Sequence, residues 1–243
     1  SLLTDGIDSI MLIGTPGITG NRAVAKIVDG TYVPSGKLSD TWAKDSKSAP
    51  SFQSMGNYST FKYKNSNEKF VEYAEGIYVG YRYYVTRAMT DSNYNYEDEV
   101  LFSFGEGKSY TTFEKWIAAQ EIDQEKGEGK VTVSVKNTGE IAGKDVIEIY
   151  NHSPYTGRIE KSWHSLLAFR KTNVIEPGET KTYELSFKLR DMANWDTEKG
   201  YFVNEEGEYE ISRRDDVWHE SVSSGHTNNF KFNLPLIEYK TSY

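Results

Sequence analysis

The sequence predicts two kinds of fold in one chain, an α/β part followed by an all-β sandwich, and three observations support this. The first 30 residues join an apolar run, a glycine-rich turn and a helical pattern. From residue 131 onward, apolar side chains instead recur at every second position, which is the period of a β-strand. The length of 243 residues allows one large core or two ordinary ones.

The α/β part is predicted to begin with a strand, a turn and a helix. Residues 10–13 are a short apolar run that ends at Gly14, as is typical of a buried parallel strand. Residues 21–28 place apolar side chains on one helical face, and Gly30 stands where a helix would stop. Residues 34–70 are rich in Pro, Ser, Gly, Asn and Tyr, so we expect a long ordered loop there.

The all-β part is predicted from alternation and from turn residues. In VTVSVKN, Val131, Val133 and Val135 alternate with polar residues, and TYELSFKLR repeats this pattern. The segments DVIEIYNH, SLLAFRK, GYFVN and GEYEISR lie between and after them, with turn signals such as NTGE, EPGE and NEEGE. Six or seven short strands at roughly ten-residue spacing indicate an antiparallel sandwich of the immunoglobulin or fibronectin type III kind.

The glycines near the first helix raise the question of a nucleotide site. A dinucleotide fingerprint has the spacing G-x-G-x-x-G, whereas Gly14, Gly17 and Gly20 have the spacing G-x-x-G-x-x-G, and Pro16 removes one donor N–H. A phosphate loop would continue with Lys and Ser or Thr, but Asn-Arg follows here. Asp40 follows Gly20 by 20 residues, which is the sequence spacing of a ribose-binding acid. However, the segment before Asp40, VPSGKL, contains a Pro-Ser-Gly turn just after the helix. The spacing therefore favours a tight turn between strand and helix.

The composition excludes several classes of protein and site. The net charge of −8 argues against a nucleic-acid partner. The sequence contains no run of about 18 apolar residues, so no membrane span is predicted. With no Cys there is no disulfide, thiolate zinc site or Cys nucleophile. No metal site or cofactor is predicted, because the histidines show no paired spacing: His152, His164, His219 and His226. The opening lacks a Met, so we expect that the chain begins inside a longer protein.

Four motifs, in order, resemble glycoside hydrolase family 3, the β-glucosidase-like group. GTPGITGNRAVAKIVDGTYVPSGKLSDTWAKD resembles the end of its α/β-sandwich domain, and EYAEGIYVGYRYY resembles its Y-E-E-G-I-Y-V-G-Y-R-Y-Y. LFSFGEGKSYTTFE resembles its F-P-F-G-Y-G-L-S-Y-T-x-F-E. VSVKNTGEIAGKDVIEIY, LLAFRKTNVIEPGET and GEYEIS resemble its fibronectin type III-like domain. The likeness runs from about residue 9 to residue 212.

The resemblance implies a division of the chain and a function. Residues 1–118 would be the C-terminal part of the α/β-sandwich domain, 119–213 the fibronectin type III-like domain, and 214–243 a tail or linker. The complete protein would be a retaining glycosidase that cleaves terminal β-linked glucose from glycosides or oligosaccharides without a cofactor. Its partners within the same enzyme would be a TIM barrel and the N-terminal α/β portion. The alternative is a non-catalytic carbohydrate-binding or adhesive module with a fibronectin-like fold.

The resemblance also implies that this chain supplies no catalytic, substrate-binding or metal-binding residue. Retaining glycosidases use two carboxyl groups about 5–5.5 Å apart. In the family the nucleophile is an Asp on the barrel, commonly in Ser/Thr-Asp-Trp, and the acid/base Glu lies upstream of the segment that begins near residue 9. Ser39-Asp40-Thr41-Trp42 looks like the nucleophile motif, but it directly follows PSGKL, so Asp40 is interpreted as a loop acid. Glu72 and Glu75 lie in a motif that the family uses structurally.

The aromatic segment GIYVGYRYY offers a further choice. If the segment is extended, Ile77, Val79, Tyr81 and Tyr83 share one face, and Tyr78, Arg82 and Tyr84 share the other. Two apolar or amphipathic faces favour a position between two domains over a platform for stacking sugars. Weaker candidates for an outer sugar subsite are the aromatic residues of the long loop: Trp42, Phe52, Tyr58 and Phe61.

Overall fold

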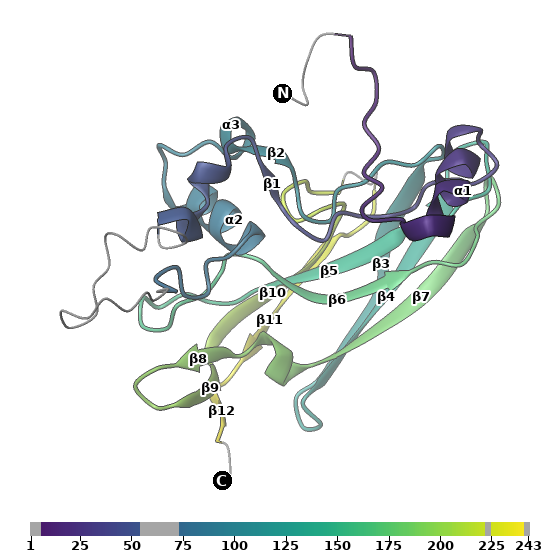
Figure 1. Cartoon of the computed structure of the whole chain (residues 1–243). Helices are drawn as coiled ribbons and strands as arrows, with labels where there is room; N and C mark the ends of the chain where they lie inside the picture. Colours follow the sequence, from purple (N-terminus) through teal and green to yellow (C-terminus); the bar gives the residue numbers. More distant parts are fainter. Residues whose placement is uncertain (1–5, 54–72, 222–224, 241–243) are drawn as a thin grey trace.

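The computed structural model describes residues 6–53, 73–221 and 225–240 (Figure 1). Two sheets form the body: a three-stranded sheet of order β3-β4-β7 and a four-stranded sheet of order β11-β10-β5-β6. Their strands are β3 (Phe113–Asp123), β4 (Glu128–Asn137), β5 (Val146–His152), β6 (Ser165–Lys171), β7 (Thr180–Lys188), β10 (Gly207–Arg214) and β11 (Asn229–Leu234). All neighbours within these two sheets are antiparallel. The predicted sandwich is confirmed.

The alternating residues fill the space between the two sheets. Val131, Val133 and Val135 on β4 are fully buried, and they pack with apolar residues of β5 and β10 such as Ile149 and Ile211. Because successive side chains of a strand point to opposite faces, this alternation fixes which face of each strand enters the core. The sequence pattern and the core of the sandwich therefore agree residue by residue.

The smaller elements border this sandwich. A small sheet of order β12-β9-β8 contains β8 (Asn194–Asp196), β9 (Tyr201–Asn204) and β12 (Ile237–Tyr239), next to a 3₁₀ helix at Leu189–Met192. A second group of elements lies together in the upper left of Figure 1: β1 (Trp42–Ala43), β2 (Val100–Phe102), α2 (Tyr81–Thr90) and α3 (Tyr96–Glu99), with two 3₁₀ helices at Ser46–Ser48 and Pro50–Gln53. The remaining helix, α1, spans Gly17–Val28.

The predicted strand at residues 10–13 does not form. Its side chains are 43–56% exposed, and no strand is assigned there. A strand needs a neighbour to pair its backbone groups, and no described strand pairs with this run. The helix after it is confirmed, but it begins at Gly17 rather than at residue 21, and none of its residues is buried. It ends at Val28, and Gly30 follows with a φ of 80°.

The aromatic segment is a second correction, because it is not extended beyond Gly80. Gly80 has a φ of 56°, and α2 begins at the next residue. Tyr84 and Val85 are buried in a second core cluster together with Tyr150 of β5. Tyr81 and Ala88 pack against the same cluster, so positions 81, 84, 85 and 88 form one helical face. This face joins the first part of the chain to the sandwich.

The predicted boundaries of the sandwich also change. Strand β3 begins at Phe113, so it crosses the predicted division between residues 118 and 119. The predicted tail at 214–243 contains β11, which pairs with β10 from Gly207↔Leu234 onward, and β12, which pairs with β9. Phe230 and Phe232 of β11 pack on the main core and Leu234 is buried in it. Burial of these side chains explains why the segment is a strand of the sandwich.

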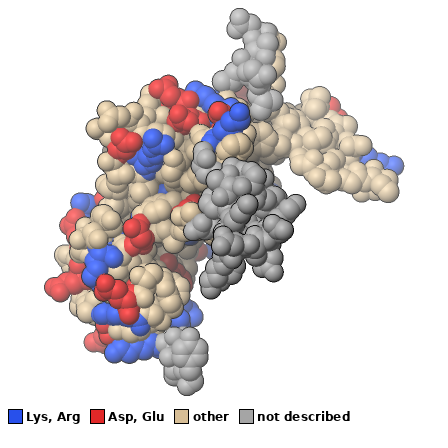
Figure 2. All heavy atoms as spheres, turned by 60° about the vertical axis from the view of Figure 1, so that its left-hand side comes forward, with Lys and Arg blue, Asp and Glu red and all other residues tan. Residues whose placement is uncertain are grey.

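Charged side chains of both signs are interspersed over the face drawn in Figure 2. This distribution gives that face no continuous basic surface of the kind that binds a phosphate backbone. Within the part of the chain that the structure describes, no helix has both the length and the apolar character needed to cross a bilayer.

Candidate functional site

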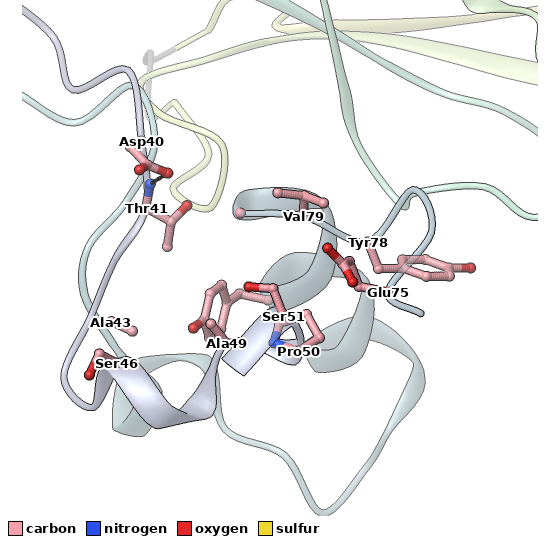
Figure 3. A pocket seen from close by; sticks show the side chains of 12 residues that line it. Asp40, Thr41, Ala43, Ser46, Ala49, Pro50, Ser51, Glu75, Tyr78 and Val79 are labelled. Carbon is pink, nitrogen blue, oxygen red and sulfur yellow. Dashed lines mark hydrogen bonds between the residues drawn. The ribbon is translucent and has the colours of Figure 1, made fainter. Parts of the chain in front are cut away.

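A cavity of about 310 Å³ lies between the loop of residues 40–51 and the turn that leads into α2 (Figure 3). It contains the two acids that the sequence singled out and the structure describes, Asp40 and Glu75. Thr41 and Ser51 also line the cavity, and Tyr84 of α2 closes one side. Both described acids of the first part of the chain therefore line one cavity. Glu72 lies outside the described residues.

The two acids occupy different positions in this cavity. Asp40 is exposed at the rim, where its Oδ1 accepts a hydrogen bond of 2.8 Å from the Thr41 backbone N–H. The carboxylate of Glu75 lies across the cavity and points into it (Figure 3). Its Oε2 is enclosed without a hydrogen-bond partner among the described residues. A retaining pair needs two carboxyl groups that face one sugar from both sides. Asp40 is thus an exposed acid of the loop whose carboxylate is engaged by the N–H of the next residue.

The tyrosines of the cavity are neutral phenols at neutral pH. Burial, together with the hydrogen bond and charge of Glu160, raises the pKa of Tyr78, whose hydroxyl donates to the Glu160 carboxylate. Tyr78 points away from the cavity in Figure 3. Burial likewise raises the pKa of Tyr84, whose hydroxyl lies 3.0 Å from Ser48 Oγ. Neither phenol therefore provides an acid or base near pH 7.

The glycine loop is built as a turn into α1. Gly14 and Gly17 have φ values of 58° and 65°, which other residues rarely adopt. A Cβ at Gly20 would lie 2.5 Å from Cβ of Pro16, so this glycine is needed where the turn meets the helix. Pro16 caps the helix without a side-chain hydrogen bond and has no N–H to offer a phosphate. The geometry agrees with the turn that the spacing favours.

Comparison with known families matches both parts of the chain. Residues 2–81 match the glycosyl hydrolase family 3 C-terminal domain, and residues 145–216 match the fibronectin type III-like domain. The chain belongs to glycoside hydrolase family 3. The predicted combination of an α/β segment with a fibronectin type III-like sandwich is therefore confirmed.

Curated family 3 relatives carry the name β-glucosidase. The β-glucosidase of Ruminococcus albus is 36% identical over 86% of this chain and 20% of its own length. β-Glucosidase A of Butyrivibrio fibrisolvens is 32% identical over 84% of this chain and 25% of its own length. Among solved structures, β-glucosidase 3B from Thermotoga neapolitana in complex with α-D-glucose has a TM-score of 0.75 and 32% identity, covering 91% of this chain and 28% of that one. The chain thus spans a quarter or less of these curated relatives.

The aromatic residues that the sequence singled out make different kinds of contact. Tyr81 accepts a hydrogen bond of 3.1 Å from the Leu166 N–H, and its ring lies 4.6 Å from that of Phe104. These contacts attach Tyr81, the first residue of α2, to β6 and to the segment after β2. Trp42 packs edge-on against Phe102 in the β1–β2 pair, and Phe52 is exposed. Tyr58 and Phe61 lie outside the described residues.

The histidines form a grouping that sequence spacing does not reveal. His152, His164 and His219 line one cavity in the family 3 sandwich, although 67 positions separate the first from the last. His226 lies elsewhere and stacks on Trp116 at 4.4 Å between ring centroids. Among the described residues no three His, Asp or Glu side chains are arranged to hold a metal ion. The antiparallel pairing of β5 with β10 brings this grouping together, and no local motif announces it.

Proposed function

We propose that this chain is the part of a retaining β-glucosidase that contains the end of its α/β-sandwich domain and its fibronectin type III-like domain, and that its role there is to pack domains rather than to supply a catalytic carboxylate. The names of the relatives support the activity of the whole enzyme, which would cleave terminal β-linked glucose from glycosides or oligosaccharides. The catalytic pair would come from the barrel and from the N-terminal α/β portion. The position of Asp40 at a loop rim supports this division of labour.

One observation carries the packing role, namely the exposed apolar run before α1. Ile10, Met11, Leu12 and Ile13 are all 43–56% exposed, and Ile18 at the start of α1 is fully exposed. Apolar patches of this kind on a protein surface mark interaction sites. The occupant we assign is the remaining portion of the α/β sandwich, since the chain spans only 20–25% of relatives that match it here. That portion would supply the strand neighbours that residues 10–13 lack.

The experiment replaces two residues of this run. In the 243-residue chain, Ile10→Asp with Leu12→Asp should lower the fluorescence of a bound hydrophobic dye and reduce self-association. The melting temperature should stay within about 2 °C, because neither side chain contributes to the described cores. Phe169→Asp is the matched control, since Phe169 is an exposed apolar residue of β6 outside this run. It should leave dye binding unchanged.

Two results would count against the packing role. A fall of many degrees in the melting temperature of the double variant would mean that the run packs within the chain. Dye binding that falls equally in Phe169→Asp would mean that the run is not the adhesive surface.

A further inference from the structure

Strand β5 carries a carboxyl group that is buried where the first part of the chain meets the sandwich. Glu148 is only 5% exposed. A Cβ added to Gly105, in the turn of residues 103–107, would lie 2.2 Å from Glu148 Oε2 and 2.9 Å from Oε1. The carboxylate therefore lies directly against the backbone of this turn, and we call this contact the seam.

Backbone hydrogen bonds hold the turn in place. The Gly105 N–H donates to the Leu38 carbonyl at 2.8 Å, and the N–H of Val217, in the loop after β10, donates to the Phe104 carbonyl at 3.0 Å. The Val217 side chain is fully buried in the second core cluster. Because the bond from Val217 joins the loop after β10 to the turn, this amide reports on whether the seam is closed.

The Glu148 carboxylate has little in the protein to stabilise its charge. Its Oε2 accepts a hydrogen bond of 2.6 Å from the Tyr150 hydroxyl. No Lys, Arg or His nitrogen of the described residues forms an ion pair with it. A buried carboxylate without a paired cation is costly, and the gain of a proton from solvent removes that cost.

The cations around this carboxylate are held by other acids. Lys115 and Lys37 lie 2.6 and 3.5 Å from the Asp145 carboxylate. Arg214 stands directly opposite in the pairing of β10 with β5, but its guanidinium lies 3.3 Å from the carboxylate of Glu220. Each of these three cations is therefore already paired with a different carboxylate.

The other elements at the seam present two acids and an aromatic residue. Asp216, in the loop after β10, contributes negative charge near Glu148. Glu106 is the acid of the turn itself, and its Oε2 accepts a hydrogen bond of 3.0 Å from the Ser103 N–H. On β6 the residue opposite Glu148 is Phe169. These surroundings favour the neutral carboxyl over the carboxylate.

The direction of the resulting pH dependence follows from these contacts. Burial raises the pKa of Glu148 above its ordinary value of 4.5, and it outweighs the Tyr150 hydrogen bond and the charges of Lys37 and Lys115, which act to lower the pKa. The folded chain therefore binds this proton more tightly than the unfolded chain does. The contribution of Glu148 to stability is fully present below the unfolded pKa and is lost as the pH rises through the folded pKa.

We propose that Glu148 is a pH-sensitive latch at the seam. With a proton on the carboxyl, the turn of residues 103–107 closes tightly on β5. With the carboxylate ionised, the seam opens more readily, because opening lets water reach the charge. The proposal goes beyond the packing role, since it gives a contact within this chain a dependence on pH, and it does not depend on the activity of the complete enzyme.

Glu148→Gln in the 243-residue chain tests the latch, because glutamine keeps the size of the side chain and can accept the Tyr150 hydrogen bond but cannot ionise. The melting temperatures of the variant and the wild type are compared from about pH 4.5 to about pH 8. The value for the variant minus that for the wild type should increase by at least about 2 °C over this range. This difference cancels the titration of the other groups.

Glu184→Gln is the matched control, since Glu184 is a glutamate of β7 whose side chain is 56% exposed. Solvent stabilises the charge of such a group in the folded chain nearly as well as in the unfolded one. Its difference from the wild type should therefore change by less than about 1 °C over the same pH range.

Hydrogen exchange of the Val217 amide measures opening of the seam itself. The protection factor, which is the intrinsic exchange rate divided by the observed rate, removes the ordinary effect of pH on exchange. In the wild type it should fall at least about fivefold between about pH 5 and about pH 8. In Glu148→Gln it should stay within about twofold.

The outcomes separate the latch from a merely structural role. A melting difference that grows with pH, together with loss of Val217 protection in the wild type, supports the latch. A difference that is constant with pH overturns it, because then only the packing of the amide has changed, and an equal change in Glu184→Gln overturns it as well. Constant protection of Val217 in the wild type also overturns it, and that measurement decides even if Glu148→Gln does not fold.

Discussion

Replacing Lys115 by methionine is expected to lower the free energy of unfolding at pH 7 by about 3 kcal/mol. The Lys115 side chain is 4% exposed, and its Nζ lies 2.6 Å from Asp145 Oδ2 and 3.5 Å from Asp215 Oδ1. Methionine keeps most of the side-chain volume but removes the nearest cation of the buried Asp145 carboxylate and leaves it the more distant Lys37, at 3.5 Å. Breaking a buried ion pair from one side is costly because the remaining charge stays buried.

Urea unfolding of the wild type and Lys115→Met measures this loss. Lys126→Met is the matched control: Lys126 lies equally close to a carboxylate, 2.6 Å from Asp123, but is 74% exposed. Solvent screens such a pair, so the control should lose less than about 1 kcal/mol. Equal losses in the two variants would contradict the importance of burial at Asp145.

The loss should also depend on pH in a definite direction. Burial alone would raise the pKa of Asp145, but the charges of Lys115 and Lys37 outweigh it and hold the pKa below its usual value. A carboxyl with a lowered folded pKa stabilises the protein above its unfolded pKa of about 3.9, and this stabilisation disappears as the pH falls through the folded value. The difference between wild type and Lys115→Met should therefore shrink below about pH 4.

Gly105→Ala is expected to lower the free energy of unfolding by about 2–4 kcal/mol, which is the second large effect. Gly105 has a φ of 83°, and a Cβ there would lie 2.2 Å from Oε2 of the buried Glu148. Its backbone cannot easily move away, because its N–H donates to the Leu38 carbonyl at 2.8 Å. The substitution combines a strained backbone with an overlap at the seam between the two parts of the chain.

Gly127→Ala separates these two causes. Gly127 also has a positive φ, 69°, in the turn between β3 and β4, but nothing lies within 4 Å of its added Cβ. In Gly127→Ala the free energy of unfolding should fall only by the contribution of the strained backbone, about 1–2 kcal/mol. Thermal unfolding of both variants gives the comparison. If Gly127→Ala loses as much as Gly105→Ala, the contact with Glu148 is not what makes Gly105 necessary.

The sandwich could be predicted from the sequence because alternation reports burial directly. Val131, Val133 and Val135 needed no knowledge of their partners, since a period of two already assigns one face to a core. The same signal was present in NFKFNL, where Phe230, Phe232 and Leu234 alternate, but the polar residues before it favoured a linker. That strand was predictable in principle.

Other features depend on contacts that the sequence does not display. The apolar run at residues 10–13 has the composition of a strand, yet a strand forms only against a neighbour. Segment 77–84 fitted an extended alternation, whereas the spacing of Tyr81, Tyr84 and Val85 was the helical signal. The cavity with His152, His164 and His219 requires the register of β5 against β10, which no local pattern gives.

The central claim is that this chain packs domains and does not itself carry the catalytic pair, and hydrolysis of 4-nitrophenyl β-D-glucopyranoside by the 243-residue chain tests it most directly. We predict no release of nitrophenol above a protein-free blank, because a retaining reaction needs two carboxyl groups about 5–5.5 Å apart around one sugar. Asp40→Asn and Glu75→Gln, which alter the two acids of the cavity in Figure 3, should give the same baseline. Turnover clearly above the blank that disappears in either variant would contradict the claim and place the catalytic chemistry within this chain.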